Sequence, residues 1–539
     1  MLRPDGQSFA AVVAERARAA PSHPAILYQD RTISYGELVD RAVAAAKALM
    51  AQGLTSADRI GILMGNDPDF VVLTVAASML GISLVPLNTW YKRNELAWAI
   101  RHADLAALIV VRKFLKADYG QVLSDVVPAL SARSPRANTT LEAFPRLRLV
   151  VFIGEAPSGV LSWPDFLREG EGIAGSVLQA AREAASHRPA SFILYTSGST
   201  AEPKGVILSH DKVIANGFDL GQRRGITSED RIWFGTPLFY ALGATNALPA
   251  AITAGATMVL QNHFEAGSAI DLIERTEASV YYGTGNISRA ILDHPDYAQR
   301  RIGSLKKGNA GLGAEYKRLT LVEMGITGAV PAYGLTETCG NAAVGLPDDP
   351  LEIKLATDGL PLPGMQMLIV DPVSRKPLRQ GELGLVLVRG NTTDGYLNNP
   401  VETNKAIDAD GFFDTGDLGR FDSDGRFVFH SRLKEVIKSG GINISPIEVE
   451  QLLVTHPDVR GAYVVGVRDA ARGEAIVAFV DVFRPVSERN LCDHVRNRAA
   501  TFKAPHHVFF RNEEQLPRLA SGKVSKYRLQ EEAARELGL

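Results

Sequence analysis

Apolar runs and amphipathic stretches alternate along the first part of the chain. Val39, Val43, Ala46 and Met50 fall on one helical stripe, and the apolar run Ile60–Met64 that follows is typical of a short buried strand. The alternation continues with these expected elements: a helix near 69–80, a strand at Leu84–Leu87, a helix near 94–103 and a strand at Ala106–Val111. Continuous apolar strands separated by helices predict a parallel sheet covered on both faces.

A second block of the same kind follows a weaker stretch. Between about 115 and 145 the pattern gives way to Ser, Pro and Arg, which indicates a surface connection, and strands are expected at Leu147–Ile153 and Phe192–Tyr195. The second block has these expected elements: a strand at Arg231–Leu238, a helix at 243–253, a strand at Ala256–Leu260, a helix at 267–276 and a strand at Ser279–Tyr282. Two successive blocks predict two packed α/β layers within one large unit.

The pattern changes twice more toward the C-terminus. After about residue 357, Gly, Pro and Asp separate short apolar runs such as Met367–Val370 and Leu383–Val388, which predicts a β-rich section. Near 434 it changes again, and Ser445 is expected to cap a helix that starts at Pro446. The remaining expected elements are strands at 461–467 and 474–483, a helix near 487–500 and a strand at His507–Phe510.

The predicted fold class is therefore α/β. Residues 1–433 are expected to form a large N-terminal domain of two doubly covered sheets plus a β-rich subdomain. Residues 434–539 are expected to form a small, mobile C-terminal α+β domain.

Composition favours small-molecule chemistry. Of the 539 residues 46% are hydrophobic and 22% are charged, and the net charge of −2 gives no electrostatic reason for binding nucleic acid or an anionic membrane. Cys339 and Cys492 are too few for a disulfide framework and lack metal-ligand spacing, which favours a reducing, cytoplasmic setting. No signal peptide is expected at the N-terminus, and the apolar run 70–87 is interrupted too often to predict a membrane span.

The stretch Ser191–Val206 carries the strongest chemical signal. An apolar strand runs into a loop of small and hydroxylated residues, with Lys204 near its end. Backbone N–H groups, hydroxyls and one lysine suit a phosphate, although a polar surface turn has the same composition. A Walker-type loop fits less well, because that loop needs Ser or Thr after the lysine and here Gly205 follows.

Further stretches with suitable chemistry lie far apart along the chain. Each taken alone is compatible with an ordinary turn or a solvated charge. Ala332–Thr338 offers an aromatic ring, hydroxyls and a carboxylate that could hold Mg²⁺, and Gly411–Asp417 ends in a carboxylate suited to a ribose diol. Ser431–Pro446 combines basic residues with a Gly pair, and Leu516–Lys523 ends in a lysine on a Gly-containing loop.

The order and wording of these stretches, from Thr32–Leu38 to Lys523, resemble the adenylate-forming superfamily of acyl-CoA synthetases, aryl-CoA ligases, luciferases and peptide-synthetase adenylation domains. The resemblance implies ATP, Mg²⁺ and coenzyme A as ligands. It also implies the following roles: ATP phosphates at Thr196, Ser197, Gly198, Ser199, Thr200 and Lys204; adenine at Gly308, Asn309, Ala310 and Tyr333; the α-phosphate at Thr336; Mg²⁺ at Glu337; ribose at Asp417 and Arg432; and the substrate carboxylate and α-phosphate at Lys523.

The same resemblance implies a two-step cycle. The small domain would turn about a hinge at Lys434 between a pose for adenylation and a pose for thioester formation. In the second pose Lys523 withdraws, Lys438 approaches, and Gly440 and Gly441 reach the mouth of a tunnel for the pantetheine thiol.

At some positions the residue differs from the one that is usual in the family. Ala201 replaces the commonest Gly and Ser431 stands where Gly or Asp is usual, and neither change argues against ATP use. The acyl-pocket strip 236–243 carries Phe239 and Tyr240 and lacks the Asp that pairs with an α-ammonium group, so an amino acid substrate is not expected.

The opposite wall of the acid pocket is expected at Tyr282, Gly283 and Asn286. Its neighbour Tyr281 either lines the pocket or is a core residue of the strand. Aromatic walls with a glycine floor fit an aryl acid or an aliphatic chain, and the choice stays open, as does the oligomeric state.

The predicted function is an ATP-dependent carboxylic acid:CoA ligase that acts through an acyl-adenylate and releases pyrophosphate and AMP. The alternative is an adenylating enzyme that transfers the acyl group to a carrier-protein thiol or an amine instead of CoA. A different class would be a nucleotide-binding protein that has lost catalysis, against which Lys204, Glu337 and Lys523 argue.

Overall fold

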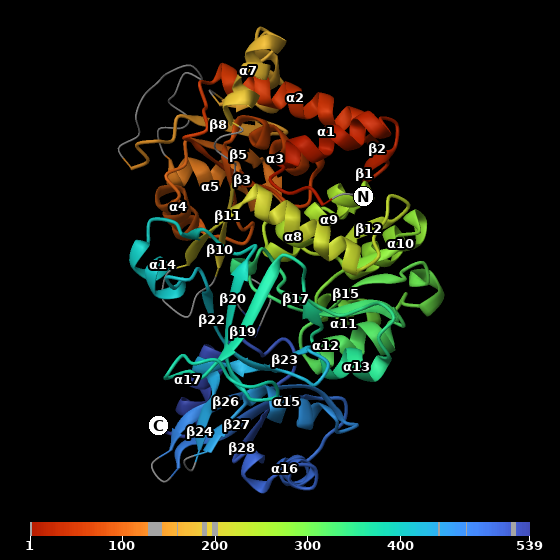
Figure 1. Cartoon of the computed structure of the whole chain (residues 1–539), viewed down its shortest axis with the longest axis vertical. Helices are drawn as coiled ribbons and strands as arrows, with labels where there is room; N and C mark the ends of the chain where they lie inside the picture. Colours follow the sequence, from red (N-terminus) through yellow and green to blue (C-terminus); the bar gives the residue numbers. More distant parts are fainter. Residues whose placement is uncertain are drawn as a thin grey trace.

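The structure is a computed structural model of the chain. It describes residues 3–127, 143–158, 160–185, 191–196, 203–439, 442–469, 472–518 and 524–539, without the side chains of residues 314, 315 and 443. Two large sheets and the helices around them occupy the upper part of the molecule, a smaller sheet lies beneath them, and the C-terminal elements lie at the lower end (Figure 1).

The first large sheet has eight strands, in the order β21-β11-β10-β4-β3-β5-β8-β9. Their bounds are β3 Arg59–Leu63, β4 Ser83–Pro86, β5 Ala107–Val111, β8 Leu149–Ile153, β9 Leu161–Ser162, β10 Ser191–Thr196, β11 Lys204–Ser209 and β21 Gly395–Tyr396. Strands β10, β4, β3, β5, β8 and β9 run parallel, whereas β11 pairs antiparallel with both β10 and β21.

The second large sheet has nine strands, in the order β18-β17-β16-β15-β14-β12-β13-β1-β2. Their bounds are β1 Pro24–Tyr28, β2 Arg31–Ser34, β12 Arg231–Phe234, β13 Thr257–Leu260, β14 Val280–Tyr282, β15 Lys307–Gly311, β16 Gly328–Tyr333, β17 Ala343–Val344 and β18 Leu360–Pro361. Its central strands are parallel, so their carboxyl ends share one edge.

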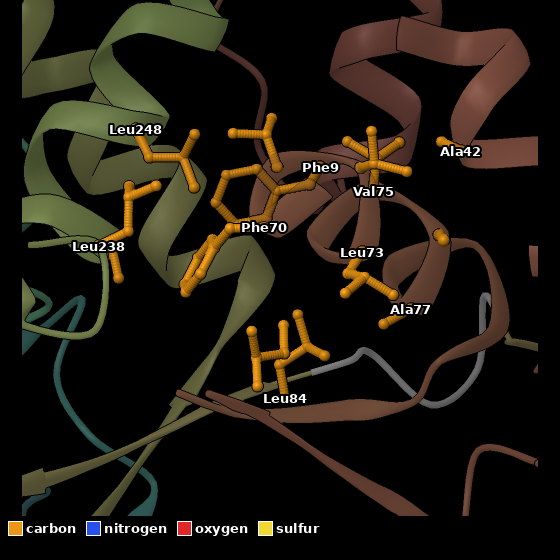
Figure 2. Close-up of a cluster of buried hydrophobic side chains, with 14 of the residues drawn as sticks. Phe9, Ala42, Phe70, Leu73, Val75, Ala77, Leu84, Leu238 and Leu248 are labelled. Atoms are coloured by element: carbon orange, nitrogen blue, oxygen red, sulfur yellow. The ribbon is translucent and has the colours of Figure 1, made fainter. Parts of the chain in front are cut away.

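One layer of helices packs between the two large sheets. It is built from α1 Phe9–Ala19, α2 Tyr35–Ala51, α3 Pro68–Leu80, α8 His210–Arg223 and α9 Leu248–Ala254, together with the π-helix η2 Leu242–Ala247. Figure 2 shows Phe9, Phe70, Leu84, Leu238 and Leu248 meeting in this layer, and the same cluster includes residues of both sheets. Helix α3 is buried on every side, which explains why it is apolar all round instead of striped.

Other helices cover the outer faces of both sheets. Against the eight-stranded sheet lie α4 Arg93–His102 and α5 Tyr119–Val126, with α6 Trp163–Glu169 and α7 Gly175–Ala185 nearer the inner layer. Against the nine-stranded sheet lie α10 Ala266–Thr276, α11 Gly285–Leu292, α12 Ala314–Arg318 and the short elements η3 Gln299–Ile302 and η4 Leu319–Glu323. Both sheets are thus covered on two faces, as predicted.

Two smaller sheets complete the chain. A four-stranded antiparallel sheet is formed by β19 Met365–Val370, β20 Gly384–Gly390, β22 Phe413–Phe421 and β23 Phe427–Arg432. Helix α14 Pro400–Ala406 contacts β22, whereas α13 Leu351–Ala356 packs against α12 and β16. The last sheet contains β24 Ile437–Ser439, β25 Ile442–Ile444, β26 Val459–Asp469, β27 Gly473–Val482 and β28 His507–Phe510, with α15 Pro446–Val454, α16 Glu488–Arg496, η7 Thr501–Lys503 and α17 Lys526–Glu536. Its two hydrophobic clusters contain only residues from 437 onward.

Most predicted elements are present, and the cap of α15 is confirmed. The Ser445 side chain accepts a hydrogen bond from the Glu448 N–H, and Pro446 is the first helical residue. Cys339 is fully buried in the hydrophobic cluster between the two large sheets, which is typical of a small packing residue. No helix of the described residues is long and apolar enough to cross a membrane.

Two expectations were wrong. The stretch 115–145 was expected to be a surface connection. Its first part instead contains β7 Ala117–Asp118, which pairs with β6 Lys113–Phe114, and the helix α5, whose Leu123 and Tyr119 are buried. Residues 128–142 of this stretch lie outside the described residues. A single short helix carries too few turns for its periodicity to stand out. The strand expected at Arg231–Leu238 ends at Phe234, because Asn66 then binds the backbone of the next residues.

Candidate functional site

The predicted phosphate loop connects two paired strands. β10 and β11 form an antiparallel hairpin in which Thr196 lies opposite Lys204, so the loop between them starts and ends at one edge of the sheet. Ser197, Gly198, Ser199 and Thr200 lie outside the described residues. The Lys204 Nζ is 2.6 Å from a carboxylate oxygen of Glu402 in α14, and it lies 4.8 Å from the centre of the Tyr396 ring. Hydrogen bonds and charge from Lys204, and then from Lys405, lower the pKa of Glu402 to about 2.

Tyr396 joins the lysine to the predicted metal ligand. Its hydroxyl donates to the Glu337 carboxylate at 3.0 Å, and Glu337 lies with Thr336 in the short 3₁₀ helix η5 Thr336–Thr338. The backbone just before β21 also holds η5 in place, since the Thr393 N–H donates to the Glu337 carbonyl at 2.7 Å. Tyr396 reaches this position because β21 pairs with β11, which sets it opposite Val206.

The predicted ribose carboxylate lies in the four-stranded sheet. Asp417 in β22 pairs with Arg432 in β23, and the Arg432 Nε is 3.4 Å from the Asp417 Oδ1. The Tyr333 hydroxyl donates to the other carboxylate oxygen at 2.8 Å. The Tyr333 ring is itself buried against Phe427 and Phe429. Burial raises the pKa of Asp417 to about 6, although Arg432 and the Tyr333 hydroxyl oppose that shift.

These groups belong to one electrostatic cluster. The negative charge of Glu337 raises the pKa of Asp417, and the positive charge of Arg432 lowers the pKa of both Asp417 and Tyr396. The Asp417 Oδ1 is buried and, among the described residues, has no hydrogen-bond partner. Residues from β11, η5, β21, β22 and β23, which are far apart in the chain, therefore converge on a common region.

The predicted adenine strip is strand β15. Gly308, Asn309 and Ala310 lie in its middle, and the Asn309 side-chain amide donates to the Gly283 carbonyl at 3.4 Å. Gly308 has a φ of +138°, and a Cβ at this position would come within 2.1 Å of the Tyr281 carbonyl oxygen. Only glycine fits this close approach of β15 to β14.

One wall of the predicted acid pocket is aromatic. Phe239 and Tyr240 pack on each other, and Trp90 lies 6.0 Å from the Phe239 ring and 6.1 Å from the Tyr240 ring. The Asn88 side-chain amide donates to the Tyr240 hydroxyl at 3.0 Å. Asn66 donates to the Phe234 and Thr236 carbonyls and accepts from the Leu238 N–H, which anchors the strip that carries both rings.

The opposite wall starts at the carboxyl end of β14. Tyr282 ends this strand, Gly283 follows it, and Asn286 lies in the first turn of α11. Tyr281 points to the other face, where it stacks on Trp233 and bonds the Ser288 hydroxyl, so it is a core residue. The strand alternation thus decides between the two interpretations of Tyr281.

The C-terminal part approaches this wall. Leu516 and Arg518 line the same small pocket as Gly285 and Asn286. Lys523, Gly440 and Gly441 lie outside the described residues. Lys434 lies in the 3₁₀ helix η6 Leu433–Glu435, between the two smaller sheets, and Lys438 is exposed in β24.

Some residues of the site were not predicted from the sequence. They are Asn66, Asn88, Trp90, Tyr396 and Glu402. Asn66, Asn88 and Trp90 follow strands β3 and β4 directly, and residues just beyond the carboxyl ends of parallel strands are a usual source of ligand contacts. Tyr396 and Glu402 carry no such signal, because only the long-range pairing of β21 with β11 brings them to Lys204.

Comparisons with known proteins agree with this geometry. Residues 13–397 match the model of the AMP-binding enzyme family, and residues 448–523 match that of the AMP-binding enzyme C-terminal domain. The chain is 30% identical to the putative acyl-CoA synthetase YngI of Bacillus subtilis, over 96% of this chain and 95% of the relative. It is 34% identical to a methyl-dioxo-octahydroindenyl-propanoyl:CoA ligase of Mycobacterium tuberculosis, over 98% and 99% of the two chains.

Solved structures give the same result. ATP-bound MatB from Rhodopseudomonas palustris superposes with a TM-score of 0.78 and is 26% identical, covering 98% of this chain and 100% of that one. The resemblance to adenylate-forming enzymes and the predicted fold class are both confirmed. The chain belongs to the AMP-binding enzyme family, whose members bind ATP and form adenylates.

Proposed function

We propose that this protein is an ATP-dependent carboxylic acid:CoA ligase that works through an acyl-adenylate. The observation that carries the proposal is the convergence of Lys204, Glu337, Asp417 and Arg432, with Tyr396 joining the first two. A cation, a metal-binding carboxylate and a diol-binding carboxylate are what a nucleoside triphosphate requires at its two ends. The relatives named as acyl-CoA synthetases and CoA ligases support the same reaction.

Different residues bind the phosphates, the adenine and the ribose of ATP. Thr196, Lys204 and the loop Ser197–Thr200 bind the β- and γ-phosphates, and Thr336 binds the α-phosphate. Gly308, Asn309 and Ala310 flank the adenine with Tyr333 behind them, and Asp417 accepts hydrogen bonds from the ribose hydroxyls beside Arg432. The buried Asp417 Oδ1, which lacks a hydrogen-bond partner among the described residues, supports this role, because such an atom is stabilised by a ligand donor.

Glu337 fits a Mg²⁺ ion that is shared with the nucleotide. The described residues contain no group of three or more His, Cys, Asp or Glu side chains that could hold a metal by themselves. Mg²⁺ is commonly held by one or two carboxylates together with substrate phosphates, so a single carboxylate beside the phosphate lysine is sufficient. When bound, the ion would neutralise phosphate charge. Tyr396 orients Glu337 for that contact.

The first half-reaction joins two anions. The substrate carboxylate oxygen attacks the α-phosphorus, the new C–O–P bond forms, and the bond to pyrophosphate breaks. Lys523 bridges the carboxylate and the α-phosphate and so offsets their repulsion. Arg518 lines the same small pocket as Asn286, and because Arg518 precedes Lys523 by only five positions in the sequence, this supports the role.

The second half-reaction needs a different arrangement. Residues 434–539 form a domain that turns about Lys434 relative to residues 1–433, and the separate hydrophobic clusters on the C-terminal side support this division. The turn withdraws Lys523, brings Lys438 toward the site, and sets Gly440 and Gly441 beside the entering CoA thiol. The thiol then displaces AMP from the acyl-adenylate.

The acid lies between the Trp90, Phe239 and Tyr240 rings and the Tyr282–Asn286 wall. The strip 236–243 holds no carboxylate that would pair with an ammonium group, which supports an acid without an α-amine. The substrate is therefore an aryl or aliphatic carboxylic acid, and the M. tuberculosis relative, named for a bicyclic propanoyl group, supports a bulky acid.

Two measurements test this function. Exchange of labelled pyrophosphate into ATP should depend on added carboxylic acid, and a protein that only binds nucleotides would give no exchange. Release of AMP should then accelerate on addition of CoA. If AMP release instead responds only to a carrier-protein thiol or an amine, the alternative acceptor is correct.

Tyr396→Phe should lower the rate of adenylation about tenfold. The ring that contacts Lys204 remains, whereas the hydrogen bond to Glu337 is lost, and a hydrogen bond to a charged group contributes roughly 1.5–3 kcal/mol. The measurement is kcat for pyrophosphate exchange at saturating ATP over a range of Mg²⁺ concentrations. Tyr527→Phe, at an exposed tyrosine of α17, serves as the control. An unchanged kcat and Mg²⁺ response would remove Tyr396 from the site.

The apparent KM for ATP should rise as the pH falls below about 6. The raised pKa of Asp417 means that its carboxylate becomes protonated in that range and then accepts fewer hydrogen bonds from ribose. The steady-state KM between pH 5 and 8 checks this, and Asp417→Asn should flatten the profile.

The raised pKa of Asp417 also affects the free energy of unfolding. A fall in pH should weaken ATP binding but stabilise the folded state. A carboxyl pKa raised above its unfolded value of about 3.9 makes protonation favour the folded state. The contribution of Asp417 to stability is thus unfavourable above pH 6 and is relieved as the pH falls from 6 toward 4. As the pH falls from 6 toward 4, the free energy of unfolding of a ligand-free Asp417→Asn variant should rise less than that of the wild type.

A further inference from the structure

Arg224 is a buried cation that the nucleotide chemistry does not use. It caps the C-terminus of α8, and only 1% of its surface is exposed. A guanidinium stays charged in proteins, so it needs acceptors wherever it is buried. Its Nη2 donates to the Asn309 Oδ1 at 3.2 Å, whereas Nε and Nη1 have no acceptor at hydrogen-bond geometry among the described residues.

The acidic groups near Arg224 along the chain are engaged elsewhere. Asp219, one turn earlier in α8, binds Arg3 at 2.8 Å. Asp230, at the start of β12, binds Lys307 at 2.8 Å. No carboxylate of the described residues lies within ion-pair distance of Arg224. Among the described residues the buried guanidinium therefore has no carboxylate partner, an arrangement that is destabilising unless something else supplies an acceptor.

The guanidinium lies against the predicted acid pocket. Its carbon is 4.8 Å from the centre of the Tyr282 ring, and Tyr282 is the last residue of β14 before Gly283. The Tyr282 hydroxyl is also buried, and burial raises its pKa, while the charge of Arg224 and a hydrogen bond from it oppose that shift. Asn309, which binds Arg224 on one side, donates to the Gly283 carbonyl on the other. Arg224, Tyr282 and Asn309 thus form one polar cluster between the predicted acid-pocket wall, to which Tyr282 belongs, and the predicted adenine strip, to which Asn309 belongs.

We propose that this polar cluster recognises a second oxygen function, a carboxylate or a ketone, at the end of the substrate away from the activated carboxylate. The inference rests on the proposed ligase function and narrows its substrate class. Arg224 donates from Nε and Nη1, and the Tyr282 hydroxyl donates beside it. A site built to hydrogen-bond a substrate group discriminates strongly against an analogue that lacks it, because its buried polar atoms are then left unpaired.

The experiment compares acids of equal length that differ only at the far end. Octanoate, octanedioate and 7-oxo-octanoate are tested by pyrophosphate exchange with the wild-type protein, Arg224→Met and Arg224→Lys. The wild type should show a higher kcat/KM for the two oxygen-bearing acids than for octanoate, by on the order of 10²-fold. Arg224→Met should reduce this preference to within a few-fold, and Arg224→Lys should restore part of it for octanedioate. Arg231→Met, at a half-exposed arginine of β12, is the matched control and should keep the wild-type preference.

Thermal unfolding provides a second readout that separates recognition from a structural role. Removal of a buried charge that has no carboxylate partner among the described residues should leave the Tm of ligand-free Arg224→Met equal to or above that of the wild type. Octanedioate should raise the Tm of the wild type but not that of the variant. A lower Tm together with an unchanged preference would mean that Arg224 only supports the fold, and the inference would be overturned.

The outcomes also distinguish this inference from the function on which it rests. If none of the acids supports exchange, and a wider panel of acids also fails, the ligase proposal is wrong. If octanoate supports exchange as well as octanedioate does in both the wild type and Arg224→Met, the ligase proposal stands and the distal oxygen site is wrong.

Discussion

Lys523→Ala should abolish formation of the acyl-adenylate while the purified variant still converts a supplied acyl-adenylate and CoA into acyl-CoA and AMP. The lysine is proposed to bridge two anions in the first transition state only. Loss of one such charge contact typically lowers a rate by on the order of 10²–10³. Acid-dependent pyrophosphate exchange measures the first half-reaction, and AMP release from synthetic acyl-adenylate measures the second.

This pair of assays separates the two-pose cycle from a fixed site. Lys376→Ala, at an exposed lysine of the β19–β20 connection, should leave both half-reactions at wild-type rates. If Lys523→Ala slowed both half-reactions equally in a folded protein, a lysine acting in one pose alone would be ruled out. A normal first half-reaction would instead remove Lys523 from the chemistry.

The second large effect is expected at Glu337. Glu337→Gln keeps the shape of the side chain and an oxygen that can accept from Tyr396, yet it removes the charge proposed to hold Mg²⁺. The kcat of adenylation should fall by on the order of 10²–10³, and the Mg²⁺ concentration for half-maximal rate should rise. A Mg²⁺ titration of pyrophosphate exchange at saturating ATP measures both quantities.

The control for this substitution is Glu352→Gln, at an exposed glutamate of α13. It should change neither the rate nor the Mg²⁺ requirement. Should Glu337→Gln lower the rate without altering the Mg²⁺ requirement, Glu337 would be acting through the local fold instead of through the metal. In that case Tyr396→Phe should also lower the rate, by a smaller factor, without altering the Mg²⁺ requirement.

The sequence predicted the layers of the fold more completely than the contacts of the site. Apolar strands such as Ile60–Met64 and amphipathic helices such as α10 have a periodicity that depends on local neighbours alone, so it can be read from one chain. Asp417 and Glu337 were predicted from their motifs, and the structure brings both into one electrostatic cluster.

The missing contacts depend on pairings between distant residues. The neighbourhood of Lys204 includes Tyr396 and Glu402 only because β21 joins the edge of β11, about 190 residues away in sequence. Arg224 resembles a solvated charge at the end of an amphipathic helix, and its burial follows from its position over β14 and β15. Short elements such as α5 have too few turns to be recognised by periodicity.

The ion pair between Lys204 and Glu402 has a consequence for the order of events in the proposed cycle. The chain already carries an anion of its own where the triphosphate is expected, so the incoming nucleotide must exchange places with that carboxylate. In the proposed cycle the departure of pyrophosphate would be the reverse exchange, because Glu402 would re-form its ion pair with Lys204 as the product leaves. Because Glu402 competes with the phosphates for Lys204, the affinity for both ATP and pyrophosphate should be lower. Weaker binding of the product favours faster turnover.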